Sequence, residues 1–307
     1  MGARILVAGP PRSGTTWVAE LLAAGEPVWS VHEPDNHRLW PSAVVAKAGR
    51  GRQPVIADGD GALQYRALWV AASQGADNRA KPGIYARKAA LKAVGTRVVD
   101  RLVIGNGALR HEAALHVLAA APKAKPRSDS RPVVVKTVHA NFSLEFVAEH
   151  FDRVVLVRRD PRNAVASWLG LGWSVPRYEG DPGVMERVVE PAGLVPPARH
   201  EPTVDTAWAY ALLDHQVEAM SRAHPEWLTV HHEQLCDDPL AELERLYHHA
   251  GLTWNAKVGA AVVATDREGA GYATRRKRSE QRDRWKKRLT DDQVKLIEQT
   301  LDSTGVR

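Results

Sequence analysis

The sequence has a single cysteine and no long hydrophobic run, and each shortage excludes a class of protein. Cys236 is the only cysteine among 307 residues, so a disulfide scaffold is excluded. A lone thiol is typical of a reducing cytoplasm. No apolar stretch approaches the roughly 20 residues that span a bilayer, and no signal peptide is visible. We therefore expect a cytoplasmic protein with no membrane partner.

The composition is otherwise that of a globular protein. Hydrophobic residues make up 44% of the chain, enough to bury a full core without disulfides. Frequent Ala, Arg, Gly and Val are typical of a GC-rich bacterial genome. Short apolar segments alternate with longer helical patterns, which favours an α/β fold with a parallel sheet and a ligand site at the carboxyl ends of its strands.

The patterns predict five strands and eight helices. The strands cover residues 4–8, 27–31, 132–136, 153–157 and 227–231. The helices cover residues 15–24, 83–103, 107–121, 142–150, 161–169, 203–223, 238–250 and 290–302.

The first motif joins a predicted strand to a predicted helix. It reads Gly9-Pro10-Pro11-Arg12-Ser13-Gly14-Thr15-Thr16-Trp17. A helix that starts at such a break offers unpaired backbone N–H groups and the positive end of its dipole, which together bind phosphate. Arg12 adds a fixed cation, and hydroxyl donors come from Ser13, Thr15 and Thr16. The Gly-Lys-Ser/Thr ending of nucleoside-triphosphate loops is absent, and a tight turn with chance polar residues is the structural alternative.

The second motif follows the strand predicted at 153–157. Pro161 suits the first position of a helix, with Asp160 as its cap. Arg159 then leaves the end of the strand, and Ser167 lies two turns into the helix, so both can face one phosphate. A salt-bridged helix start would be the alternative for this run taken alone.

Together the two motifs resemble those of sulfotransferases that use 3′-phosphoadenosine 5′-phosphosulfate (PAPS) and release 3′-phosphoadenosine 5′-phosphate (PAP). The order matches, and 145 positions separate Gly14 from Arg159. The resemblance implies that the first loop holds the phosphosulfate, with Trp17 stacking on adenine. It also implies that Arg159 and Ser167 hold the 3′-phosphate. The structural alternative for Trp17 is a helix residue whose aromatic ring faces the core.

Two further segments extend the resemblance. The segment Val230–Leu240 is similar to a family segment that usually carries Tyr where this chain has His232. Residues 279–290 look like the basic segment that closes over the nucleotide. Within that segment the resemblance assigns nucleotide contacts to Arg284, Trp285 and Lys286.

Positive charge is concentrated in residues 275–288. Nine basic and two acidic residues give this segment a net charge of +7, against +6 for the whole chain. A basic tract can bind nucleic acid, but this one lacks repeated aromatic interleaving. We favour a flap over the anionic PAPS and expect no nucleic-acid partner.

The chemistry needs cations near the leaving phosphate and a base for the acceptor. Sulfuryl transfer resembles phosphoryl transfer in its loose, in-line transition state, so positioning and electrostatics dominate. Arg12 occupies the position at which the first loop of the family carries a lysine. Lys136 corresponds by position to a family lysine that reaches the sulfuryl group. A solvated strand-end lysine is the alternative for Lys136. We expect no metal.

The base is predicted to be Glu33, just past the strand at 27–31. Its position resembles that of a carboxylate in several bacterial and Golgi-type sulfotransferases. The animal cytosolic enzymes use a histidine two residues beyond the lysine, where this chain has Val138. Strand alternation predicts that His139 points to the opposite side. We therefore prefer Glu33 over His32 and His139, with a helix-capping carboxylate as the structural alternative for Glu33.

The expected function is transfer of a sulfuryl group from PAPS to a hydroxyl or amine of a small-molecule, carbohydrate or lipid acceptor. The alternatives are a P-loop-type nucleotide kinase and a non-catalytic nucleotide- or nucleic-acid-binding protein. The resemblance implies one domain over residues 1–307 with a P-loop-like parallel sheet, and is compatible with a homodimer. Residues 35–130 and 171–203 would be insertions that shape the acceptor pocket, and 275–288 the basic flap.

Overall fold

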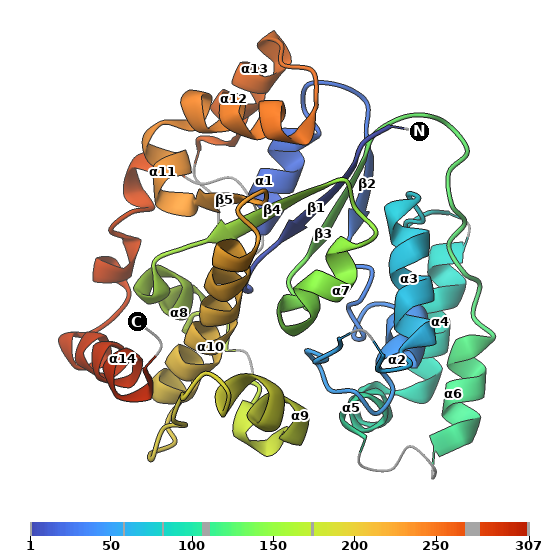
Figure 1. Cartoon of the computed structure of the whole chain (residues 1–307), viewed down its shortest axis with the longest axis horizontal. Coiled ribbons are helices and arrows are strands. Elements are labelled where there is room, and N and C mark those ends of the chain that lie inside the picture. Colours follow the sequence, from blue (N-terminus) through green and yellow to red (C-terminus); the bar gives the residue numbers. More distant parts are fainter. Residues whose placement is uncertain are drawn as a thin grey trace. The chain divides into compact units, whose positions relative to one another are not determined.

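A computed structural model describes residues 2–57, 59–81, 83–105, 111–172, 175–267 and 277–305. Five strands form one parallel sheet flanked by helices, as predicted (Figure 1). The sheet order is β2-β3-β1-β4-β5. The strands are β1 (Arg4–Ala8), β2 (Trp29–His32), β3 (Val133–Thr137), β4 (Arg153–Arg158) and β5 (Leu228–His231). Valine-rich β3 and β4 are almost continuously buried, as strands covered on both faces are.

The chain divides into two compact units. Unit 1 comprises Met1–Leu6 and Pro27–Val154, and unit 2 comprises Val7–Glu26 and Val155–Arg307. The single domain predicted from the sequence stays a prediction. Among the described residues, no helix is both long enough and apolar enough to cross a membrane.

In unit 1, β2 pairs with β3 in parallel, with Trp29 opposite Val133 and His32 opposite Lys136. A helical layer packs around a cluster of Val44, Val99, Leu102, Val103 and Leu118. The elements of this unit are α2 (Pro41–Lys47), α3 (Leu63–Ser73), α4 (Gly83–Val94), α5 (Thr96–Ile104), α6 (Glu112–Ala119), η2 (Asn141–Ser143) and α7 (Leu144–Ala148).

In unit 2, β4 pairs with β5 in parallel, and the long helix α10 packs against α8 and α14. The α-helices of this unit are α1 (Thr15–Leu22), α8 (Pro161–Leu169), α9 (Pro182–Val184), α10 (Pro202–Ala223), α11 (His232–Asp237), α12 (Pro239–Ala250), α13 (Ala256–Thr265) and α14 (Asp291–Thr304). Its shorter turns are η3 (Tyr178–Gly180), η4 (Met185–Val189), η5 (Arg278–Glu280) and η6 (Arg284–Lys287).

The prediction of one helix over residues 83–103 is wrong in one respect, because this segment forms two helices. Gly95 separates α4 from α5 with a φ of 82°, a conformation that glycine adopts without strain. The helix predicted over 142–150 is a short 3₁₀ turn followed by the five residues of α7. Residues 107–110 of the predicted helix 107–121 lie outside the described part. Sequence patterns did not reveal α2, α3, α9, α11 or α13.

Candidate active site

The predicted phosphate loop, in unit 2, has the backbone conformation of an anion-binding turn. Arg12 and Gly14 both have positive φ, 71° and 104°. Such left-handed residues in a turn direct successive N–H groups into an anion-binding concavity. Helix α1 begins at Thr15 with no side chain capping its first turn. Ser13 is fully buried, and its Oγ has no hydrogen-bond partner in the described part of the chain. A buried hydroxyl without a partner is what an absent ligand leaves behind.

Two glycines of this loop are required by close packing. A Cβ on Gly14 would lie 2.5 Å from Cδ2 of His232, and one on Gly9 would lie 2.2 Å from the carbonyl oxygen of Val157. Cβ atoms essentially never come within 3.0 Å of another heavy atom. Any larger residue would therefore displace β4 or the His232 ring.

The two predicted phosphate motifs of unit 2 are in contact with each other. Nε of Arg12 donates to Oγ of Ser167 at 2.9 Å, and Nη1 of Arg159 donates to the carbonyl oxygen of Arg12 at 3.1 Å. The start of α8 also agrees with prediction. Pro161 is its first residue, and the Asp160 carboxylate accepts from a backbone N–H of the first turn. Residues far apart in the chain thus meet at one place.

Arg159 lies in a concentration of guanidinium groups. Its side chain is only 9% exposed, its Nε has no hydrogen-bond partner among the described residues, and Oε1 of Glu233 is 3.9 Å away. Burial lowers the pKa of Arg159, as does Arg284, although Glu233 opposes the shift. Burial likewise lowers the pKa of Arg288, with Arg284 and Arg159 adding to it. Three neighbouring cations with one carboxylate favour binding of a multiply charged anion.

The predicted closing segment is attached to α8 through Asn163. Its Nδ2 donates to the carbonyl oxygen of Arg282 at 2.8 Å, and its Oδ1 accepts from the N–H of Trp285 at 3.1 Å. The guanidinium of Arg162 lies over the indole of Trp285, 4.5 Å from the ring centroid. Nζ of Lys286 lies 5.6 Å from the same centroid. Residues 275 and 276 of the predicted flap lie outside the described residues.

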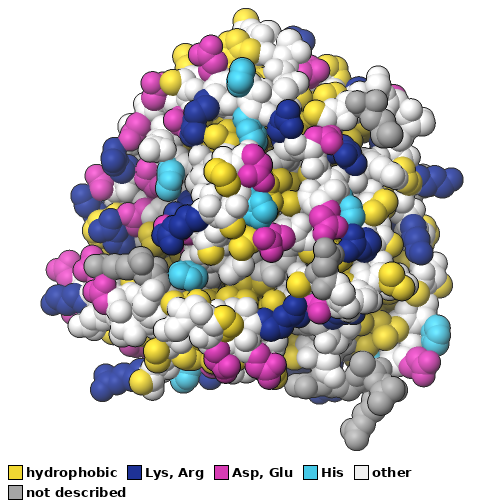
Figure 2. All heavy atoms as spheres, viewed as in Figure 1, with side chains coloured by type: hydrophobic (Ala, Val, Ile, Leu, Met, Phe, Trp, Pro, Cys, Tyr) yellow, Lys and Arg dark blue, Asp and Glu magenta, His cyan; other side chains and the backbone are white. Residues whose placement is uncertain are grey.

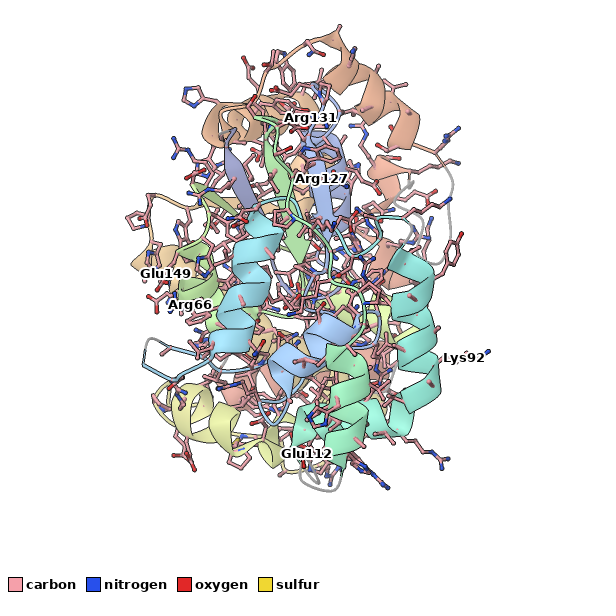
Figure 3. The ribbon with its side chains drawn as sticks, turned by 90° about the vertical axis from the view of Figure 1, so that its right-hand side faces the viewer. Arg66, Lys92, Glu112, Arg127, Arg131 and Glu149 are labelled. Atoms are coloured by element: carbon pink, nitrogen blue, oxygen red, sulfur yellow. The ribbon has the colours of Figure 1, made fainter. Side chains whose placement is uncertain are left out.

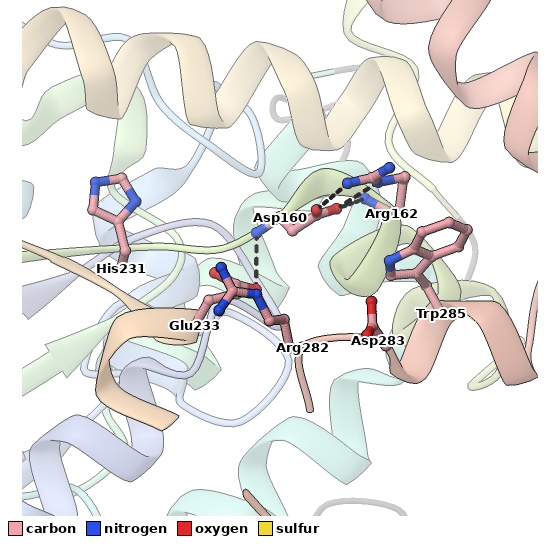
Figure 4. A pocket seen from close by; sticks show the side chains of 7 residues that line it. All are labelled: Asp160, Arg162, His231, Glu233, Arg282, Asp283 and Trp285. Carbon is pink, nitrogen blue, oxygen red and sulfur yellow. Dashed lines mark hydrogen bonds and ion pairs between the residues drawn. The ribbon is translucent and has the colours of Figure 1, made fainter. Parts of the chain in front are cut away.

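A pocket of about 360 Å³ opens beside this segment (Figure 4). The backbone N–H of Asp160 donates to Oε1 of Glu233 at 3.2 Å across its floor. The carboxyl ends of β4 and β5 both reach it, where ligands of such sheets bind. Of its lining, only Trp285 was predicted; the full set is Asp160, Arg162, His231, Glu233, Arg282, Asp283 and Trp285.

Trp17 is a buried helix residue, 7% exposed. Its Nε1 donates to Oγ1 of Thr265 at 3.1 Å, and its ring lies 5.7 Å from that of His232. Burial and the charge of Arg159 lower the pKa of His232 far below its ordinary value, so that ring is neutral at neutral pH. Stacking of Trp17 on adenine stays a prediction.

The predicted catalytic pair lies in unit 1, at the carboxyl ends of β2 and β3. The N–H of Glu33 donates to the carbonyl oxygen of Lys136 at 2.7 Å, which continues the strand pairing by one residue. Nζ of Lys136 donates to Oε1 of Glu33, and Nδ2 of Asn36 donates to Oε2 at 2.7 Å. Both carboxylate oxygens are therefore held. Asn36 was not predicted, although it lies only three positions beyond Glu33.

Glu33 combines backbone strain with burial. Its φ is 45°, and Glu33 and Arg12 are the non-glycine residues with positive φ in the described part of the chain. Strained residues of this kind occur at functional sites, where the surrounding structure holds them in place. Burial alone would raise the pKa of Glu33, but the neighbouring His139 ring and the charge of Lys136 hold it well below its ordinary value. The carboxyl group is thus ionised at neutral pH.

The predicted orientation of His139 is wrong. Its Nε2 lies 3.6 Å from Oε2 of Glu33, on the same side as Lys136. Strand β3 ends at Thr137, whose Oγ1 accepts from the N–H of His139 at 3.0 Å, so alternation no longer applies. His32 is also close, with Nε2 3.7 Å from Oε1 of Glu33. Burial and the charge of Lys136 lower the pKa of His32 to about 4, so it is neutral at neutral pH.

A second buried polar network, close to Glu33, was missed from the sequence. Asp35 and Lys47 are both fully buried. Nζ of Lys47 donates to the carbonyl oxygen of Asp35 at 3.1 Å, and Oγ1 of Thr137 donates to its Oδ1 at 2.7 Å. Burial lowers the pKa of Lys47 to about 8, against the opposing charges of Asp35 and Glu33. This network connects the loops that follow β2 and β3.

His37 lies beside the same network. Its ring packs edge-on against His139 at 6.4 Å, and its Nε2 lies 3.7 Å from Oδ1 of Asp100. Burial lowers the pKa of His37 to about 3. Asp100 also accepts from Arg38 and Arg52. No group of three metal-binding side chains occurs among the residues that the structure describes.

Comparison with known proteins identifies the family. The model of the sulfotransferase family matches residues 4–256. No curated protein matches the chain. Solved structures similar to it include a sulfotransferase domain from the curacin biosynthetic pathway, at 14% identity, with 97% of each chain covered and a TM-score of 0.46.

Two further solved structures match this chain with similar sequence identities and TM-scores. A sulfotransferase domain from the olefin synthase of Synechococcus PCC 7002 shows 14% identity over 96% of this chain and 93% of that one, with a TM-score of 0.45. A sulfotransferase from Mycobacterium avium shows 16% identity over 100% and 78%, with a TM-score of 0.40. Because the family model matches most of its length, this chain belongs to the sulfotransferase family and is a sulfotransferase enzyme.

Proposed function

We propose that this enzyme takes its sulfuryl group from PAPS and transfers it to a hydroxyl or amine of a small-molecule, carbohydrate or lipid acceptor, releasing PAP. The observation that carries the donor assignment is the convergence in unit 2. Arg12 bonds to Ser167, and Arg159 bonds to the backbone of Arg12. A donor with phosphates at both its 5′ and 3′ ends fits two anion sites in contact with each other.

The 5′ end is assigned to the loop that precedes α1. Its unsatisfied Ser13 hydroxyl and uncapped helix start supply neutral donors, and Arg12 supplies charge. Thr15 and Thr16 stand at the first turn of the helix. Negative charge that develops on the leaving phosphate is stabilised by donors that are already in position.

The 3′-phosphate is assigned to Arg159 and Ser167, with Arg284 and the closing segment over it. The Nε of Arg159, which has no hydrogen-bond partner in the described part of the chain, and the mutual proximity of Arg159, Arg284 and Arg288 support this assignment. Trp285 and Lys286 belong to the same segment. A dianion would offset the repulsion among these guanidinium groups, so donor binding should also order the segment.

Glu33 is assigned as the base and Lys136 as the cation for the sulfuryl group. Before the reaction, Lys136 bonds to Glu33 and keeps its pKa low. When Lys136 turns to the sulfuryl oxygens, Glu33 loses that partner and its pKa rises, which strengthens it as a base. The acceptor loses its proton to Glu33 as the new S–O or S–N bond forms and the bond to the PAP phosphate breaks.

Calorimetry with two nucleotides tests the donor assignment. Arg159→Ala should weaken PAP binding far more than binding of adenosine 5′-phosphosulfate, which lacks the 3′-phosphate. A charge-assisted contact of this kind contributes about 1.5–3 kcal/mol. Arg245→Ala, at a half-exposed position on α12, is the control and should change neither affinity. Equal weakening of both nucleotides by Arg159→Ala would refute the assignment.

The acceptor is found by incubating the enzyme with PAPS and bacterial metabolite extract. Mass spectrometry should show a compound that gains one sulfuryl group in step with PAP formation. PAP formed at the same rate without any sulfated product would mean that water is the acceptor, which contradicts the proposed function.

A further inference from the structure

Unit 1 carries a concentration of positive charge that the proposed chemistry does not use. Residues 79–131 contain twelve Lys or Arg and three Asp or Glu, a net charge of +9 in a chain whose total is +6. On the face drawn in Figure 2, by contrast, positive and negative side chains are interspersed. A local excess of this size creates a positive potential that attracts an anionic partner.

Part of this charge lies along one side of α4. Tyr85, Lys88 and Lys92 follow the spacing of a single helical stripe, Lys81 lies two residues before the helix, and all four are exposed. Tyr85 is 68% exposed. The opposite side of α4 packs on the apolar cluster of the helical layer. Figure 3 shows Lys92 projecting outward from the helix.

Arg87 fixes a second lysine segment beside this stripe. Its side chain is buried, with Nε donating to the carbonyl oxygen of Pro122 at 2.8 Å and Nη1 to that of Ala80 at 3.2 Å. One guanidinium therefore holds the chain next to Lys81 against the chain next to Lys123. Lys125 follows in the same exposed segment. We call the resulting surface the lysine face; it comprises Lys81, Tyr85, Lys88, Lys92, Lys123 and Lys125.

The lysines of this face have no carboxylate partners in the described part of the chain. The ion pairs of the region involve other residues, such as Arg131 with Asp129 and Arg79 with Asp77. Like charges on one face repel each other unless an external anion neutralises them. An external anionic partner would relieve that repulsion.

The type of side chain indicates which partner. Lysine is a hydrated point charge on a flexible stem and suits a diffuse layer of charge, whereas forked recognition of single phosphates favours arginine. A cluster of about four to eight lysines or arginines is typical of surfaces that bind anionic lipid headgroups, and tyrosine is enriched at membrane interfaces. We propose that the lysine face binds the surface of an anionic lipid bilayer.

This proposal departs from the sequence expectation of no membrane partner. That expectation drew on the lack of an apolar span, but a cationic helix face binds a bilayer surface without crossing it. Helix α5 reaches from the charged surface of unit 1 toward Glu33. Its Arg97 and Arg101 are exposed, while its Asp100 pairs with His37 near Glu33. The proposal does not depend on the identity of the donor.

Sedimentation with vesicles tests the proposal. The protein should bind vesicles of phosphatidylglycerol and phosphatidylcholine, bind pure phosphatidylcholine weakly, and be released when salt rises from about 0.1 M to 1 M. Each lysine removed should weaken binding about fivefold, so Lys88→Gln/Lys92→Gln should weaken it about 25-fold.

The matched control is Lys257→Gln/Lys295→Gln, which removes two exposed lysines of unit 2 and should leave vesicle binding almost unchanged. Unchanged circular dichroism and an unchanged midpoint of thermal unfolding in both variants would show that they are folded. Equal binding to neutral vesicles, or an equal loss in the control, would overturn the proposal. So would binding to an acidic polymer such as polyglutamate without binding to anionic vesicles.

Discussion

The proposed donor-binding region of unit 2 and the proposed catalytic corner of unit 1, which comprises Glu33, Lys136 and the side chains that contact them, are built in different ways. The phosphate loop of the donor region lies in one continuous run from β1 to α1, and it meets Arg159 and Ser167 from a second such run, β4 to α8. The catalytic corner joins side chains more than 100 positions apart, Glu33 and Lys136, through pairing of β2 with β3. The donor region thus depends on backbone shape, and the corner on buried charge. The two should fail differently when changed.

The largest expected effect is in the catalytic corner. Glu33→Gln should lower turnover by about 10²–10⁴-fold, the usual worth of general-base catalysis. PAP affinity should stay nearly constant, because the amide keeps the size of the side chain and belongs to the other unit. Turnover and calorimetry on the same protein check this.

His139 supplies the comparison for that variant. Because it touches Glu33, its replacement by Gln should lower turnover, but less than Glu33→Gln does. A dead His139→Gln enzyme beside a fully active Glu33→Gln enzyme would make the histidine the base.

The next effect is on the backbone of the donor region. Gly14→Ala should weaken PAP binding by about 1–3 kcal/mol, because the left-handed backbone is strained for alanine and the new Cβ would strike His232. Gly49→Ala is the matched control. Gly49 also has a positive φ, 71°, but nothing lies within 4 Å of the place that a Cβ would take there. Equal loss of PAP binding in both variants would mean that global destabilisation, and not loop shape, is responsible.

A histidine buried in its neutral form beside the catalytic corner should also make stability depend on pH. The pKa of His37 is lowered to about 3, below its ordinary 6.5. Between these values the unfolded chain binds more protons, so stability is full above pH 6.5 and falls as the pH decreases. His37 alone should cost about 2 kcal/mol between pH 7 and pH 5. His37→Gln should flatten that dependence in urea unfolding, and an unchanged slope would contradict the burial of a neutral ring.

The smallest expected effect is that of chelation. With Arg12 and Lys136 in the cationic role, excess EDTA should leave the rate of sulfuryl transfer undiminished. Activity that is lost with EDTA and restored by magnesium would favour the kinase alternative.

The same contrast explains how far the sequence could predict the molecule. Arg159 and Ser167 were placed together because spacing along a strand and the following helix fixes where such residues lie, and the family resemblance associated them with the loop at Gly14. Alternation failed for His139 because the strand ends two residues earlier, and no local pattern marks that end. Lys47 gave no signal at all, since a lysine in a short helix predicts exposure. Only the tertiary arrangement places it against Asp35.

Single-turnover transfer at saturating PAPS tests this division of roles most directly. Arg159→Ala should regain a rate within a few-fold of the unaltered enzyme, because excess donor compensates for weaker binding. Glu33→Gln should remain about 100-fold or more slower at every PAPS concentration, because its defect lies in the chemical step. If both variants recovered at saturation, or if Arg159→Ala stayed as slow as Glu33→Gln, donor binding and catalysis would not be divided in this way.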